Sequence, residues 1–181
     1  MSSFDKFSSL LWEEAKRFYE KAKESTDQDS KLASNHAAIL LGMSALEAYI
    51  NGICDELMTF PDIPLHEKSL LKEKEIEFSS GEFKLSDKLQ IYRLTDRIEF
   101  LFFKFGGTKI NGLTEQWYGD LKNSIKLRNS LVHPKEEVRV SDNNTELLLK
   151  SVNSCLDAIS KCVYKKSFPF VALGLQSKMT F

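Results

Sequence analysis

Glycine, proline and cysteine are all scarce in this chain of 181 residues, which contains 8 Gly, 4 Pro and 3 Cys. So few turn-forming residues disfavour a β-sandwich or barrel, which needs many tight turns, and favour helices. The three cysteines, Cys54, Cys155 and Cys162, form an odd and sparse set. They predict reduced thiols in the core rather than a disulfide framework or a zinc site, and therefore a cytoplasmic location.

The chain also lacks net charge and a long apolar run. Its 25 Lys+Arg and 26 Asp+Glu give a formal net charge of −1, which excludes coating of nucleic acid through a global positive field and leaves room for a local basic patch. The most apolar stretch, residues 37–50, is too short to span a bilayer. The N-terminus lacks the basic start and apolar core of a signal peptide. We therefore expect no membrane association.

Hydrophobic periodicity predicts an all-α fold, a single-domain bundle of five or six helices over residues 1–181, without a strand ladder. Its core is expected at about 31–165, and the apolar tail at about 167–181 is expected to pack on the body or on a second subunit. The expected helices are about 4–23, 31–60, 66–77, one capped by Ser86 and closed by Gly106-Gly107, 114–133 and 146–166.

One arginine does not fit its helix. At about 100° per residue, the helix over 114–133 places Arg128 in the middle of the apolar stripe, within about 40° of Leu121 and Val132. A guanidinium stays charged and costs several kcal/mol to desolvate unless it is paired, so a carboxylate, a phosphate or a water-filled cleft is expected beside it. His133 ends the same helix, where backbone carbonyls favour a protonated imidazole. The plainer alternatives are a structural ion pair and a capping or solvent-facing histidine.

A polar strip on the helix over 31–60 offers a partner for this arginine. Ser44, Glu47 and Asn51 are spaced so that they share one helix face. We expect Glu47 to orient Arg128, with Asn51 and Ser44 in supporting positions. The alternative is a strip that is merely solvated.

Two segments carry a resemblance to a known family. Arg128-Asn129-Ser130-Leu131-Val132-His133-Pro134 resembles the motif of the HEPN superfamily (higher eukaryotes and prokaryotes nucleotide-binding domain), in which an arginine, a polar residue and a histidine lie near the end of a helix in an all-α bundle. Ser44-Ala-Leu-Glu-Ala-Tyr-Ile-Asn51 is similar to the Ser/Leu-Glu-x-x-x-Asn segment of several HEPN families. The resemblance covers about 31–165. It implies a metal-independent endoribonuclease, often a toxin or antiphage effector, whose homodimer brings two motifs together.

The resemblance implies a role for each motif residue. Arg128 would stabilise charge on the phosphorane as the RNA 2′-hydroxyl attacks phosphorus, because its planar fork holds two phosphate oxygens. His133 would transfer protons, because imidazole ordinarily titrates near neutral pH. Asn129 would donate to a phosphate oxygen or orient His133. Weaker candidates for contacts to neighbouring phosphates are Lys122, Lys126, Lys135 and Arg139, although a solvated helix face would look the same.

The expected partners are an RNA substrate and a second copy of the chain, with an antitoxin or other regulatory protein left open. DNA, a metal ion and a cofactor are not expected. Because some HEPN members have lost activity, the alternative function is a non-catalytic module that binds a partner protein, nucleotide or RNA with Arg128 locked on Glu47. A third interpretation is a scaffold bundle with an accidental motif.

Overall fold

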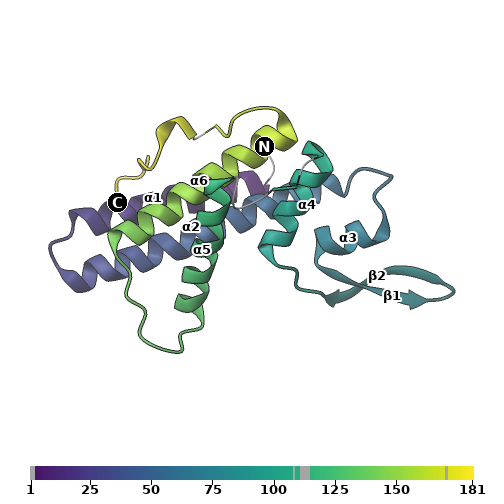
Figure 1. Ribbon diagram of the computed structural model, residues 1–181, viewed down its shortest axis with the longest axis horizontal. Helices are drawn as coiled ribbons and strands as arrows, with labels where there is room; N and C mark the ends of the chain where they lie inside the picture. Colours follow the sequence, from purple (N-terminus) through teal and green to yellow (C-terminus); the bar gives the residue numbers. More distant parts are fainter. Residues whose placement is uncertain (1–2, 108, 111–114, 170) are drawn as a thin grey trace.

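The longest helix of the chain, α2, is the axis around which the other helices pack (Figure 1). The structure is a computed structural model and describes residues 3–107, 109–110, 115–169 and 171–181. Its elements, in chain order, are α1 (Ser3–Glu24), α2 (Gln28–Leu57), α3 (Leu65–Lys72), β1 (Lys74–Ser79), β2 (Glu82–Leu89), α4 (Leu94–Gly106), α5 (Gln116–Val132), α6 (Asp142–Tyr164) and the short 3₁₀ helix η1 (Val171–Leu173). The predicted helical bundle is confirmed.

The first two helices form an antiparallel pair. The chain turns between them at Asp27, whose carboxylate accepts a 2.8 Å hydrogen bond from the Ser30 backbone N–H and so caps α2. On α1, Trp12, Ala15 and Tyr19 are buried against α2. The N-terminal helix is therefore part of the same core as the rest of the bundle.

Helix α6 covers a second side of α2. It begins at a capping box made by Ser141 and Asn144 and buries a continuous apolar face. Gly42 lies where the two helices approach closely, because a Cβ atom there would come within 2.7 Å of the Leu149 side chain. Cys54 and Cys155 lie in this core and Cys162 is half-buried, all three as free thiols, as the sparse cysteine set predicts.

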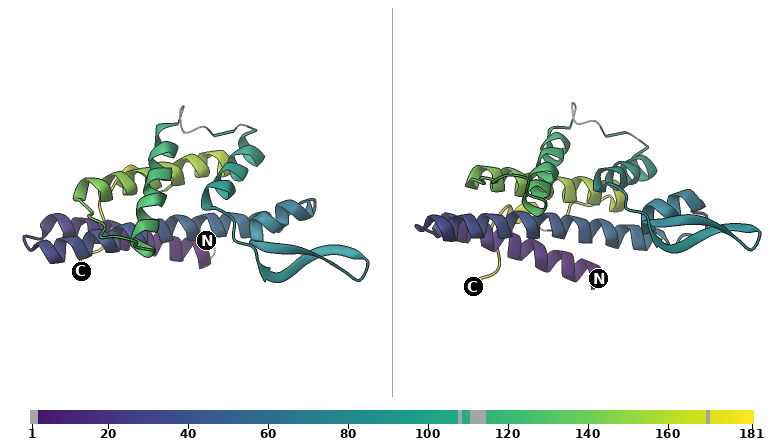
Figure 2. Two further views of the ribbon diagram at one scale, coloured as in Figure 1. Left: turned by 60° about the horizontal axis from the view of Figure 1, so that its bottom comes forward. Right: turned by 90° about the horizontal axis from the view of Figure 1, so that it is seen from below.

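A β-hairpin projects from one end of the bundle, and here the prediction of a chain without a strand ladder is wrong (Figures 1 and 2). The helix expected over 66–77 ends at Lys72, and Ser86 lies inside β2 instead of capping a helix. Ile76 pairs with Leu85 and Phe78 with Phe83, across a turn in which Ser80 and Gly81 have φ of 57° and 88°. Alternating apolar residues around a Ser-Gly turn are the ordinary signal of such a hairpin.

The C-terminal segment packs on the body of the same chain. Lys16, which is completely buried, donates from Nζ to Glu13 at 2.7 Å and to the Gln176 backbone oxygen at 2.8 Å. Arg17 Nε donates to the Phe181 backbone oxygen at 2.7 Å, and the Phe181 ring meets Phe18 edge-on. Of the two positions expected for the tail, the structure shows the one on the body.

Away from the hairpin, the helix boundaries fall within four residues of expectation, and the largest difference is the start of α6, at Asp142 instead of 146. Beside the hairpin the differences are larger, because β1 and β2 take residues that were expected in the two flanking helices. Thr114, the expected first residue of α5, lies outside the described residues.

In the described part of the chain, α2 is the one helix long and apolar enough to cross a membrane by length and composition. Of its most apolar window, 56% is buried inside the bundle. Buried core helices meet the same criteria, so this helix alone does not indicate a membrane protein.

We predict that Gly42→Leu lowers the free energy of unfolding by about 1–3 kcal/mol, because the added side chain forces Leu149 and its neighbours out of their rotamers. Ala33→Leu on the exposed side of α2 is the matched control and should stay within about 0.5 kcal/mol of the parent protein. Urea denaturation measures both. Equal effects of the two substitutions would contradict a tight α2–α6 contact.

Candidate functional site

Arg128 meets the partner that the sequence predicts for it. Its Nη2 forms an ion pair and hydrogen bond with the Glu47 carboxylate, joining α5 to α2. The Arg128 side chain is 23% exposed and the Glu47 side chain 41% exposed. The pair therefore lies at the edge of the core, where solvent screens it partly and where a ligand can reach it.

The apolar stripe that surrounds Arg128 in the sequence is buried along only part of α5. Leu121 is completely buried, whereas Val132 is 44% exposed and His133 is exposed. The fully buried residues of α5 all lie in its first half, and Leu131 of its last turn is only partly buried. Arg128 lies at the transition, which explains how a charged side chain fits in an apolar stripe.

A second arginine, which sequence analysis missed, lies next to this pair. Arg97 of α4 is 5% exposed. Its Nη2 donates to Asn51 Oδ1 at 2.7 Å, and its Nη1 contacts the Glu73 carboxylate at 3.1 Å. Asn51 thus holds Arg97 and not Arg128, which corrects its expected role. Glu47 and Asn51, one turn apart on α2, each hold one arginine.

The signal for Arg97 is present in the sequence. Phe100 and Leu101 lie on either side of it within about 60° on a helical projection, so Arg97 interrupts an apolar face as Arg128 does. The same projection, applied to the helix expected before Gly106-Gly107, would have found it. Burial raises the pKa of the Cys54 thiol, and the nearby Arg97 guanidinium opposes that rise.

Both arginines line one cleft of about 460 Å³ between α2, α5 and the start of α4. We call it the arginine cleft. It is lined by Glu47, Asn51, Glu73, Ile91, Tyr92, Arg93, Leu94, Thr95, Arg97, Ile125, Arg128 and Asn129. Three arginines face two carboxylates there, so the cleft has a positive balance in a chain with almost no net charge. This is the local basic patch that the overall composition leaves possible.

The other motif residues lie at or beyond the rim of this cleft. Asn129 is exposed and lines it. His133 is the C-cap residue of α5, with its backbone N–H bonded to the Asn129 carbonyl at 2.9 Å. His133 is exposed and does not line the cleft, so one chain does not bring Arg128, Asn129 and His133 together around a single pocket. Ser44 is exposed on α2 and does not line the cleft either.

None of the four weaker phosphate-binding candidates lines the arginine cleft. Lys122 lies over the Tyr118 ring, with its Nζ 4.5 Å from the ring centroid. Lys126 and Lys135 are exposed. Arg139, whose side chain is 89% exposed, lies 3.6 Å from the Glu137 carboxylate. The structure gives these residues solvent-facing positions around the motif.

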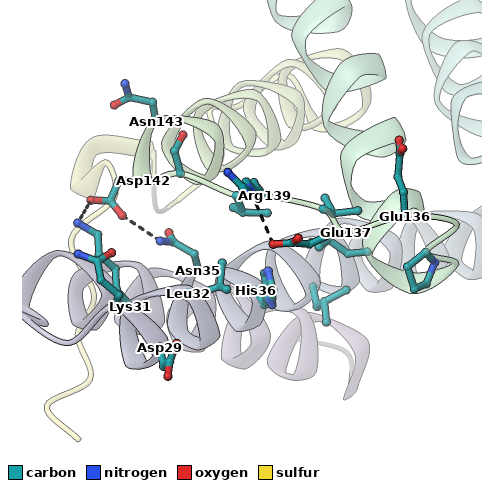
Figure 3. Close-up of a pocket in the computed structure, with 17 residues that line it drawn as sticks. Asp29, Lys31, Leu32, Asn35, His36, Glu136, Glu137, Arg139, Asp142 and Asn143 are labelled. Carbon is teal, nitrogen blue, oxygen red and sulfur yellow. Dashed lines mark hydrogen bonds and ion pairs between the residues drawn. The ribbon is translucent and has the colours of Figure 1, made fainter.

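A larger cavity of about 910 Å³ lies between the first half of α2 and the segment that joins α5 to α6 (Figure 3). Lys31 and Asn35 converge on Asp142 at 2.7 Å and 2.9 Å, which ties α2 to the start of α6. Four carboxylates and two cationic side chains line the cavity: Asp29, Glu136, Glu137 and Asp142, with Lys31 and Arg139. This negative balance makes it a poorer place for a phosphate than the arginine cleft.

Among the described residues, no group of three or more His, Cys, Asp or Glu side chains is placed to hold a metal ion. Comparison of the chain with known proteins gives no match: no family model, no curated protein and no solved structure matches it. The chemistry of the site is therefore argued from its own residues.

We predict that Asn51→Leu destabilises the protein by about 1–3 kcal/mol, because it leaves a buried guanidinium N–H without its acceptor. Ser44→Ala on the same face of α2 should change the free energy of unfolding by less than about 0.5 kcal/mol, since Ser44 is exposed. Urea titrations of both variants test whether Asn51 has a structural role that Ser44 lacks. This prediction is contradicted if Ser44→Ala lowers the free energy of unfolding as much as Asn51→Leu does.

Proposed function

We propose that the chain is a metal-independent endoribonuclease of HEPN type that works as a cytoplasmic homodimer. The observation that carries the proposal is the position of Arg128: a permanently charged side chain, held by Glu47, at the mouth of a cleft with a positive balance. The Glu47 contact uses one Nη group, and a guanidinium carries five N–H donors. Arg128 therefore keeps donors for the oxygens of a phosphodiester. A role as a toxin or antiphage effector belongs to the same proposal.

The proposed reaction divides the work between one arginine and two imidazoles. The RNA 2′-oxygen attacks the adjacent phosphorus while its proton passes to the His133 imidazole of one protomer. The bond from phosphorus to the 5′-oxygen breaks, and that oxygen takes a proton from the imidazolium of the other protomer. The products are a 2′,3′-cyclic phosphate and a 5′-hydroxyl. Arg128 stabilises the negative charge on the phosphorane, and Asn129 donates to a phosphate oxygen.

The geometry of a single chain supports the proposal of a second protomer. His133 lies outside the arginine cleft. Its neighbour Pro134 lines the larger cavity together with the apolar residues Leu32 and Leu40 of α2. Val132 is 44% exposed, and Leu32 and Leu40 are each 38% exposed. A two-fold axis near the end of α5 would cover this surface and bring two copies of the motif together.

We predict that the purified protein cleaves single-stranded RNA in the presence of EDTA, and that His133→Ala and Arg128→Ala each lower the rate at least about a hundredfold. Gel analysis with end-group chemistry should show cyclic phosphate ends. Lys150→Ala, which removes an exposed cation of α6 that lines neither the arginine cleft nor the larger cavity, is the control and should retain activity. Unchanged cleavage in both motif variants would remove the assigned roles.

The same ion pair supports a second candidate, a non-catalytic module that binds RNA, a nucleotide or a protein with Arg128 locked on Glu47. Glu47→Gln separates the two. If Glu47 orients Arg128 for catalysis, the variant should lose about a hundredfold in cleavage rate with little change in RNA affinity. If Glu47 is a lock, cleavage is absent from the parent protein and the released Arg128 binds RNA more tightly. Cleavage kinetics and fluorescence anisotropy on the same RNA measure both quantities.

A further inference from the structure

The start of α4 forms one wall of the arginine cleft and carries unsatisfied donors. Its N-cap residue is Arg93, and no side chain caps the helix. The backbone N–H groups of Asp96 and Arg97 bond to the Arg93 carbonyl at 3.0 Å and 3.3 Å. Those of Leu94 and Thr95 have no acceptor within the described part of the chain, and both residues line the cleft. An uncapped helix start concentrates partial positive charge at this wall.

Arg97 supplies an independent indication of a ligand. It is 5% exposed and lines the same cleft, and Glu73 and Asn51 give oxygen acceptors to two of its five N–H donors, with the Cys54 thiol also beside the guanidinium. Its Nε is buried without a hydrogen-bond partner in the described residues, so an acceptor in the cleft would meet the remaining Nη donors instead. Buried donors are normally satisfied, and Arg97 therefore favours an additional acceptor at this wall of the cleft.

Arg93 is a further donor for a phosphate among the residues that line the cleft. It is exposed, so its guanidinium is free to reach a ligand without desolvation beforehand. The acidic residue of the first turn of α4, Asp96, does not line the cleft. Its carboxylate therefore leaves the cleft-facing N–H groups open to an external anion.

We propose that the arginine cleft binds a phosphate group through Arg93, Arg97 and the first N–H groups of α4, and that in RNA this is a phosphate next to the one held by Arg128. The chemistry follows from the donors: a helix start and planar guanidinium groups together match the oxygens of a phosphate. The RNA assignment rests on the proposed function, because Arg128 and Asn129 line the same cleft. The phosphate site itself does not require cleavage.

The experiment uses the full chain carrying His133→Ala, so that RNA remains intact whether or not the parent protein cleaves it. Fluorescence anisotropy with a short single-stranded RNA gives the affinity over a range of salt concentrations. In this background Arg93→Gln should weaken binding and reduce the slope of log K against log salt by about 0.7, the value for one phosphate contact on a single strand. Lys104→Gln, at the opposite end of α4, removes one cation outside the cleft and should leave the slope unchanged.

Thr95→Asp separates binding from folding. A carboxylate in the first turn of a helix favours the helix dipole, so the melting temperature should stay the same or rise. The same carboxylate repels a phosphate, so RNA affinity should fall at least about tenfold. Arg97→Met is expected to lower both the stability and the RNA affinity, because it also removes the buried contacts to Asn51 and Glu73. Thr95→Asp and Arg93→Gln therefore test the site without relying on Arg97.

Inorganic phosphate and a nucleoside monophosphate, used as competitors, distinguish the source of the phosphate. The site is supported if either ligand displaces RNA from the parent protein and no longer does so in Arg93→Gln. If the monophosphate binds directly but Arg93→Gln does not change RNA binding, the assignment of the site to the RNA backbone is overturned. Unchanged affinity and salt slope in both Arg93→Gln and Thr95→Asp overturn the phosphate site. If the parent protein does not cleave RNA but these variants still lose binding, the proposed nuclease fails and the phosphate site stands.

Discussion

The energetic cost of taking two guanidinium groups out of water determines how α4 and α5 are joined to α2. Arg97 and Arg128 come from different helices, and each enters the bundle only because a polar side chain of α2 is there to receive it. Glu47 and Asn51 are one turn apart, so the two arginines are brought side by side. The arginine cleft is therefore a consequence of how the charges are paired.

Helix α2 can play this part because its apolar surface is already used for packing. α1 and α6 cover much of that surface, and Gly42 lets α6 approach closely. Glu47 and Asn51 lie at the edge of the packed surface that faces α4 and α5. Packing thus restricts the arginines to one edge of α2, where pairing holds them and where the cleft opens to solvent.

Electrostatics also distinguishes the two cavities that flank α5. The larger one carries an excess of carboxylates, some of them tied to Lys31 and Asn35. The smaller one carries an excess of arginines and an uncapped helix start. In a chain whose total charge is −1, this separation creates a local attraction for anions that composition alone does not reveal.

The sequence by itself determined the helical class of the fold and the misfit of Arg128, because helical periodicity and the cost of an unpaired charge are local properties. It also indicated Glu47 as a partner for Arg128, and the tertiary structure brings these two residues together across 81 positions of the chain. The hairpin was missed although Ile76, Phe78, Phe83 and Leu85 alternate around a turn, since the first part of β1 was assigned to the helix expected over 66–77. Only the tertiary structure decided that Asn51 receives Arg97, that Arg93 and the start of α4 join the same cleft, and that His133 lies outside it. Those facts depend on which helices cross and where the last turn of α5 leaves the core, and such distances between segments far apart in the chain are fixed by packing.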